Sequence, residues 1–167
     1  MDTVTHPHTT LDLTVLSVED LHVDPKIPTH NLYVVVRAES ITSYTTAMAA
    51  EGDGGNPSWN EKFLVDLGTH ARSITFELKS KTSTTVKDIG VARIAVSDFV
   101  GGDHGLKFFS YRLRDWEGRC NGVLNFSVIV NSPANVDPET EEAECSSGGD
   151  VLGILVCGNY SNASRDV

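Results

Sequence analysis

Apolar and polar residues alternate with a period of two along most of the first 130 residues, which is the pattern of half-buried β-strands. In the first such stretch, LDLTVLSV, the side chains of Leu11, Leu13 and Val15 fall on one face. Only residues 96–102, VSDFVGG, favour a turn of helix. Short strands between Gly-, Pro-, Asn- and Asp-rich turns predict an all-β, eight-stranded antiparallel sandwich. The predicted strands cover residues 11–18, 32–39, 43–50, 61–67, 73–79, 88–96, 108–113 and 122–130.

The alternation stops after Val130, where the composition of the chain changes. Residues 131–149 are polar, acidic and rich in turn formers, a composition that predicts disorder. Residues 151–160, VLGILVCGNY, are apolar again and fit either a strand that adds to a sheet edge or a shallow contact with a membrane or partner. The sequence therefore predicts a flexible N-terminus at 1–9, one β-domain at 10–130 and a mostly disordered acidic tail at 131–167.

Charge is distributed unevenly between these parts. The chain has a formal net charge of −10, and residues 1–130 hold 12 Lys/Arg and 16 Asp/Glu, whereas residues 131–167 hold one Arg and seven acids. This balance argues against a nucleic-acid-binding protein. One stretch opposes the trend, because residues 79–87, KSKTSTTVK, contain three lysines and no acid. Lying between two predicted strands, this stretch is predicted to be a loop.

Targeting and redox signals point to the cytosol. The first ten residues lack a cationic start followed by an apolar run, so no signal peptide is expected, and Asp2 excludes N-myristoylation. No apolar run approaches the ~20 residues of a membrane-spanning helix. Three widely spaced cysteines, Cys120, Cys145 and Cys157, suggest a reducing compartment, with Cys157 a candidate for S-acylation. The expected location is the cytoplasm, at the cytosolic face of the plasma membrane.

The sharpest local motif is NPSWNEKF, which follows the Gly-rich turn EGDGG. Proline fixes φ at the entry to a strand, and a tryptophan there can cover the end of a sandwich core. The segment resembles the Asn-Pro-x-Trp-Asn-Glu-x-Phe signature of C2 domains and fits it at every position. The matching residues are Asn56, Pro57, Trp59, Asn60, Glu61 and Phe63.

The resemblance to C2 domains extends over residues 10–130. LDLTVLSVEDL is similar to the strand that leads into the first calcium loop, and DIGVARIAVSDF to the strand after the third loop, which implies the type II topology. The architecture and the final hairpin resemble the small BONZAI-associated proteins of plants, which have a single C2 domain. That resemblance implies a copine-type protein partner at membranes and a role in restraining defence responses and programmed cell death.

The resemblance also marks the positions of calcium ligands, and here the chain departs from the family. Three acidic positions of the third loop are occupied by lysines, which offer no acceptor oxygen to a cation that needs 6–8 oxygen ligands. Asp24, Asn31 and Asp88 are the remaining candidates for a degenerate calcium site. The built-in positive charge predicts calcium-independent binding to acidic lipids. The predicted lipid-binding residues are Lys79, Lys81 and Lys87.

Three functions remain open at this point. The first is a non-catalytic module that binds acidic membranes without calcium and also binds a protein partner. The second is a calcium-dependent phospholipid binder with an unusual ligand set, and the third is an adaptor that binds only proteins. No small-molecule substrate or catalytic residue is predicted, since no nucleophile motif accompanies the histidines. Predicted strand 43–50, which matches the lysine-rich concave strand of some C2 domains, contains no lysine.

Overall fold

The computed structural model describes residues 8–23, 25, 28–39 and 41–132. Residues 133–167 of the predicted tail, with the apolar segment at 151–160 and Cys157, lie outside the described residues, and so does the start of the chain at 1–7. Asn131, which was predicted to begin the tail, is the last residue of β9. The elements are β1 (Thr9–Glu19), η1 (Thr29–Asn31), β2 (Leu32–Arg37), β3 (Ser43–Thr45), β4 (Ala50–Glu51), η2 (Asp53–Gly55), β5 (Pro57–Leu67), β6 (Ser73–Lys81), β7 (Val86–Ala95), α1 (Ser97–Val100), β8 (Lys107–Arg114) and β9 (Cys120–Asn131).

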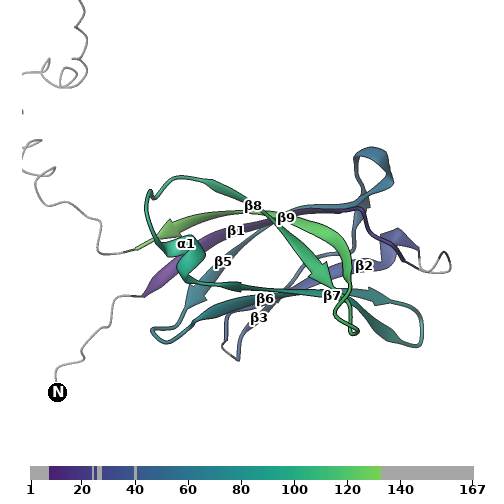
Figure 1. Cartoon of the computed structure of the whole chain (residues 1–167), viewed down its shortest axis with the longest axis horizontal. Helices are drawn as coiled ribbons and strands as arrows, with labels where there is room; N and C mark the ends of the chain where they lie inside the picture. The colour runs from purple at the N-terminus through teal and green to yellow at the C-terminus, as the bar shows by residue number, and fades with distance from the viewer. Residues whose placement is uncertain (1–7, 24, 26–27, 40, 133–167) are drawn as a thin grey trace, which may run out of the picture. The chain divides into compact units, whose positions relative to one another are not determined.

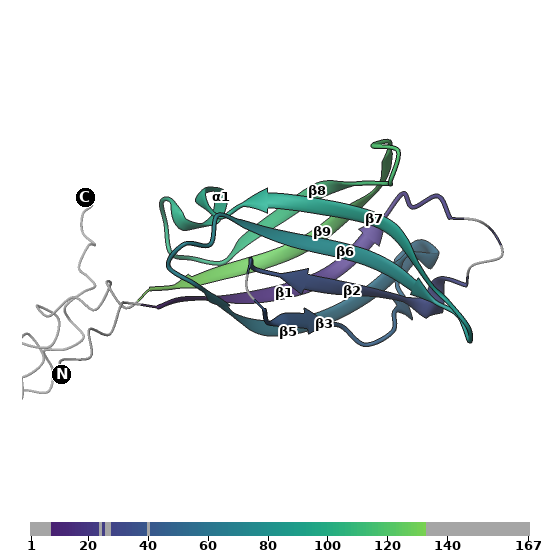
Figure 2. The same ribbon diagram turned by 90° about the horizontal axis from the view of Figure 1, so that it is seen from below.

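The strands form a curled antiparallel sheet that folds into two facing layers (Figures 1 and 2). Its strand order is β3-β2-β6-β7-β8-β9-β1-β5-β4. The two layers, β3-β2-β6-β7 and β8-β9-β1-β5-β4, are joined by a single registered pair, Val91 with Arg114. The expected all-β antiparallel sandwich is therefore confirmed.

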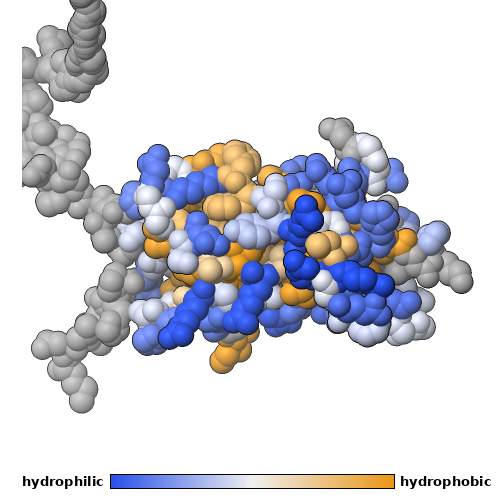
Figure 3. Space-filling model, viewed as in Figure 1, coloured by the Kyte–Doolittle hydropathy of each residue, from blue (hydrophilic) through white to orange (hydrophobic). Residues whose placement is uncertain are grey.

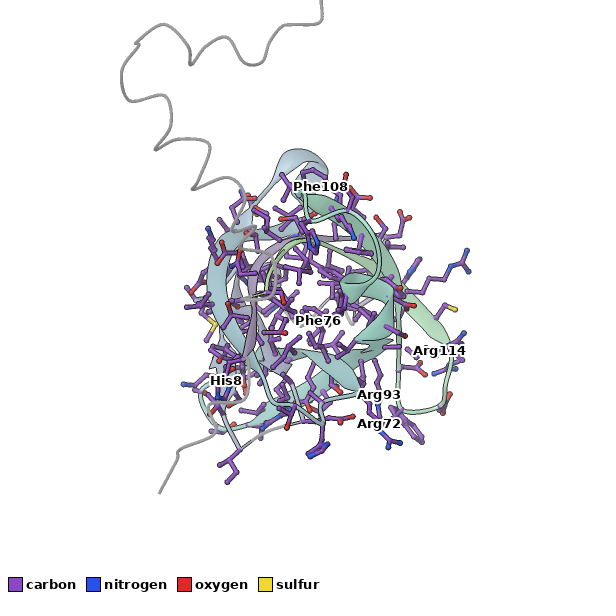
Figure 4. The ribbon with its side chains drawn as sticks, turned by 90° about the vertical axis from the view of Figure 1, so that its left-hand side faces the viewer. His8, Arg72, Phe76, Arg93, Phe108 and Arg114 are labelled. Carbon is purple, nitrogen blue, oxygen red and sulfur yellow. The ribbon has the colours of Figure 1, made fainter. Side chains whose placement is uncertain are left out.

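The core lies between the layers and is made by the apolar positions of the alternating pattern. Leu11, Leu13 and Val15 of β1 are fully buried, as their spacing predicts. Phe76 of β6 and Phe126 of β9 meet across the layers with their ring centroids 4.6 Å apart. Figure 4 shows Phe76 inside the sandwich. Burial of each such side chain contributes roughly 1.5–3 kcal/mol, which makes this core the main source of stability.

The strand count is nine rather than eight, because the strand predicted at residues 43–50 is split. Its first part, β3, pairs with β2, and its last part, β4, pairs with β5 in the other layer. Between them the hydroxyl of Thr46 accepts a hydrogen bond from the Val34 amide at 3.0 Å, and the Ala49 amide donates to the Leu32 carbonyl at 2.8 Å. These contacts with β2 hold the chain where it crosses from one layer to the other, and this crossing interrupts the strand.

The single turn of helix expected within residues 96–102 is present as α1 and buries Phe99 in the core. The ring of Phe99 meets the ring of Phe109 edge to face, with centroids 5.2 Å apart. Among the described residues, no helix is long and apolar enough to cross a membrane.

Candidate functional site

Strand directions bring four connections to one end of the sandwich. β1 and β8 are both antiparallel to β9, and β6 and β8 are both antiparallel to β7, so β1, β6 and β8 end on the same side. β5 begins on that side, since it is antiparallel to β1. We call this side the loop end; it carries the end of β1, the start of β2 and the connections 52–56, 82–85 and 115–119. The described chain enters and leaves at the opposite end, where Thr10 is paired with Asn131 (Figure 1).

The lysine-rich stretch is a tight hairpin and not the loop that the sequence predicts. β6 continues through Lys81 and β7 begins at Val86, so all three lysines belong to strands. The turn is closed by the Thr82 amide, which donates to the Thr85 carbonyl at 2.8 Å. Because consecutive residues of a strand point to opposite faces, strand register decides where each lysine points.

Register separates the lysines. Lys79 and Lys81 alternate with Leu78 and Ser80, which are buried, so the two lysines lie on the outer face of β6. Lys87 is the cross-strand partner of Ser80, so it lies on the opposite face of the hairpin. The three predicted lipid-binding residues therefore do not form one cluster.

Lys79 is neutralised by neighbouring acids. Its ammonium lies 2.6 Å from the Asp88 carboxylate and 3.2 Å from that of Glu77, and its side chain is 19% exposed. The hydrogen bond to Asp88 is the main cause that raises the pKa of Lys79, and burial opposes it. Glu77 also pairs with Arg37 at 3.3 Å. The ammonium of Lys79 thus links two acids of the hairpin, and its role in lipid binding stays a prediction.

Lys81 and Lys87 are exposed, and neither forms an ion pair with any described residue. Lys81 also borders a groove of about 470 Å³ on the outer face of β2, β3 and β6. β3 contributes no lysine to this groove, because residues 43–50 contain none, but β6 contributes two. The groove is lined by Tyr33, Val35, Arg37, Ser43, Thr45, Thr46, Met48, Lys79, Lys81 and Val86.

The candidate calcium ligands are only partly described. Asp24 lies outside the described residues, and Asn31 ends the short η1 turn, where its amide donates to the Pro28 carbonyl at 3.1 Å. The carboxylate of Asp88 is held by Lys79, a protein cation at the position where a calcium ligand is expected. Within the described part of the chain, no three His, Cys, Asp or Glu side chains come together in a way that could hold a metal ion.

The NPSWNEKF motif closes the side of the sandwich where the layers meet at β2 and β5. Pro57 opens β5 and is buried, and the Trp59 indole donates to the Leu32 carbonyl at 3.4 Å. The Glu61 carboxylate accepts a hydrogen bond from the Ala47 amide at 2.8 Å, within the crossing segment. The motif therefore ties β5 to the other layer, and β5 starts four residues earlier than predicted. The other residues of the motif are also in defined positions. The Asn56 carbonyl accepts a hydrogen bond from the Gly52 amide, and Asn60 has a left-handed φ of 49°. The ring of Phe63 packs against the ring of Tyr44.

One prominent residue of the loop end was not singled out from the sequence. Trp116 lies in the β8–β9 connection and is 87% exposed. The segment RDWEGRCNG indicates only a turn, but a tryptophan between two acids in a Gly-containing turn has no core to enter. That placement is the sequence signal that identifies an exposed aromatic.

Comparison with known proteins establishes the family of this fold. The sequence model of the C2 domain matches residues 9–111, and the chain belongs to the C2 domain family. It is 36% identical over 132 residues to BON1-associated protein 2 of Arabidopsis thaliana. The match covers 75% of this chain and 63% of that protein's length.

Solved structures agree on the fold. A C2 domain of plant Extended Synaptotagmin 1 superimposes with a TM-score of 0.64 at 18% identity, covering 76% of this chain and 97% of that domain. A C2 domain-containing protein from a putative elicitor-responsive gene gives a TM-score of 0.61 at 18% identity, covering 80% of this chain and 96% of that one. The similarity confirms the predicted C2 architecture.

Proposed function

We propose that this C2 domain is a non-catalytic module that associates with acidic membranes without calcium and binds a regulatory protein partner. The observation that carries the membrane part is the pair of exposed cations, Lys81 and Lys87, at the loop end. A lysine near an anionic leaflet contributes about 1 kcal/mol, so two contribute about 2 kcal/mol. This is weak binding by the usual affinity arithmetic, and a further contact must add to it.

The proposed partner is a copine-type protein, and the proposed role is restraint of plant defence and programmed cell death. The support is the similarity to a relative whose name describes it as associated with BON1, together with the resemblance to the BONZAI-associated family. The proposed location is the cytosolic face of the plasma membrane. Capture of the isolated partner by the full chain in the absence of membranes tests this part directly.

The proposal of calcium independence rests on charge. The ammonium of Lys79 lies 2.6 Å from the carboxylate of Asp88. A calcium ion bound by Asp24, Asn31 and Asp88 would therefore compete with this ammonium group for one of its three ligands. Lysine offers donors only, and its charge repels the ion. A calcium-dependent binder remains the alternative function, because the chain belongs to the C2 domain family and Asp24, Asn31 and Asp88 remain candidate ligands.

The deciding experiment is co-sedimentation of the full chain with phosphatidylserine vesicles, in calcium and in chelator. Equal pelleting in both buffers is the expected result. Pelleting in calcium alone would transfer the function to the calcium-dependent alternative, with Asp24, Asn31 and Asp88 as ligands. Absence of pelleting in both buffers would leave a protein-binding adaptor.

A further inference from the structure

The β8–β9 connection is a hairpin that is held by hydrogen bonds between its own residues. The Asp115 amide donates to the Arg119 carbonyl at 2.9 Å, and the Gly118 amide donates to the Asp115 carbonyl at 3.0 Å. The Asp115 carboxylate accepts from the amides of Glu117 and Arg119, each at 2.9 Å. Gly118 has φ of 82°, a left-handed conformation that glycine adopts without strain. These contacts together define the backbone conformation of the turn.

The two acidic side chains of the β8–β9 hairpin form ion pairs with one arginine, whereas two other arginines have no acidic partner among the described residues. Arg119 contacts Asp115 at 3.1 Å and Glu117 at 2.6 Å. Arg114 donates to the Gly118 carbonyl at 2.9 Å, and neither Arg114 nor Arg112 forms an ion pair within the described part of the chain. Figure 3 shows strongly hydrophilic residues over this end of β8. Residues 112–119 thus hold three arginines against two acids, and Asp20 lines a pocket beside Arg112.

Trp116 stands on this turn without a role in the fold. Its side chain is 87% exposed, and it has no hydrogen bond or ring contact with another described residue. Exposing a large aromatic to water is unfavourable, because tryptophan carries more apolar area than almost any other side chain. The hydrogen bonds of the turn hold the backbone that carries the ring and leave the ring itself uncovered. This arrangement suits a ring that is buried in a complex.

The position of Trp116 favours a lipid surface as the medium that buries it. The turn belongs to the loop end, which also carries Lys81 and Lys87, and both ribbon views place the β8–β9 hairpin towards that end (Figures 1 and 2). Tryptophan concentrates at the membrane interface, where its ring lies at headgroup level and cations meet phosphates. A protein interface has an apolar centre with about 800 Å² buried on each side, whereas this ring is flanked by charged residues.

We infer that the hairpin 115–119 is a second membrane-contact site, in which Trp116 enters the headgroup region of an anionic leaflet and Arg112 and Arg114 bind lipid phosphates. The inference deepens the proposed function, on which it rests, and supplies the additional contact that two lysines require. It places a lipid anchor on a connection outside the candidate calcium site at Asp24, Asn31 and Asp88.

The test uses the fact that the full chain contains only two tryptophans, Trp59 and Trp116. Fluorescence of the native protein and of Trp116→Phe is recorded with mixed phosphatidylcholine–phosphatidylserine vesicles, some with brominated acyl chains. The difference between the two proteins isolates Trp116 without altering the motif residue Trp59. The expected result is a blue shift and bromine quenching in the native protein and neither change in the variant.

Binding is measured in parallel by co-sedimentation with the same vesicles. Trp116→Ala is expected to weaken binding about tenfold, since the ring buries apolar area in the interface. The matched control is Phe108→Ala, which removes an aromatic side chain that is 69% exposed at the start of β8, far from the loop end. Figure 4 labels Phe108 at the periphery of the sandwich. This control is expected to bind as the native protein does.

The outcomes separate the two proposals. Vesicle binding by the native protein, with a Trp116 blue shift and a loss confined to Trp116→Ala, supports the inference. Pelleting that is unchanged in Trp116→Ala, without a blue shift, overturns the inference and leaves membrane binding to the lysines. If the native protein does not pellet, membrane association itself fails, and the inference fails with it.

Discussion

The two hairpins of the loop end, β6–β7 and β8–β9, differ in how their charges are arranged. In β6–β7, Lys79 forms ion pairs with Asp88 and Glu77, and the two exposed lysines lie on opposite faces of the hairpin. In β8–β9, the acids are matched inside the turn by Arg119, and the aromatic ring is left outside. The first hairpin carries three lysines, one of them paired with acids and the other two on opposite faces. In the second hairpin, the acids are paired and the tryptophan ring is exposed.

This difference shows why a count of charges along a chain is a poor guide to a binding surface. Cross-strand neighbours decide which charges remain available, because an acid within about 3 Å of a lysine cancels most of its field at longer range. The β6–β7 hairpin is therefore partly structural, while the β8–β9 hairpin is structurally complete without Trp116. Substitutions that change either stability or membrane binding, but not both, test this difference between the hairpins.

The largest effect is expected from Lys79→Glu. The substitution puts a third carboxylate between Glu77 and Asp88 and removes a charged hydrogen bond from a side chain that is mostly buried. Loss of such a partner costs about 2–3 kcal/mol, so the urea unfolding midpoint should fall markedly. Lys81→Glu is the control and should stay within about 0.5 kcal/mol of the native protein. Equal losses in the two variants would mean that the Lys79 contacts contribute nothing to stability.

The next effect is expected from removing the exposed pair of lysines. Lys81→Ala with Lys87→Ala should leave the unfolding midpoint unchanged and weaken binding to phosphatidylserine vesicles roughly thirtyfold, from about 1 kcal/mol for each lysine. Added salt should reduce the difference between variant and native protein, because screening weakens both cations. Lys62→Ala is the matched control, since Lys62 of β5 pairs with Asp12 of β1. If the double variant binds vesicles as well as the native protein does, the β6–β7 hairpin is not part of the membrane-binding site.

Much of the fold was predictable, and the arrangement of the site was only partly so. The buried positions of β1 follow directly from the alternation, and the NPSWNEKF motif identifies the family before any contact is known. The faces of the lysines depend on register, which shifts by one residue between Leu78 and Lys79, and no local pattern marks that bulge. The split of residues 43–50 likewise depends on a contact between Thr46 and Val34, which are distant in the sequence.

A smaller effect is expected from loosening the β8–β9 turn. Asp115→Ala removes the acceptor of two backbone amides and the partner of Arg119, which should make the turn easier to open. The amides of Glu117 and Arg119 should exchange faster with solvent in deuterium-exchange experiments, while the core amides keep their rates. Asp103→Ala, in the exposed 101–106 connection, is the control. Unchanged exchange at Glu117 and Arg119 would show that the turn is held by other contacts.

The smallest effect on the β8–β9 turn is expected from lowering the pH from 7 to 5. Hydrogen bonds from the Arg119 amide and its side chain lower the pKa of Asp115 below its ordinary value of 3.8, and Asp115 in turn raises that of Arg119. A carboxyl group whose pKa is lower in the folded state stabilises the fold above its unfolded value, and the contribution is lost as pH falls through the folded value. The turn should therefore keep its structure from pH 7 to pH 5 and open only below the ordinary carboxyl range. Amide chemical shifts of Glu117 and Arg119 followed in an acid titration check this, and a midpoint at or above the ordinary value would contradict the assigned contacts.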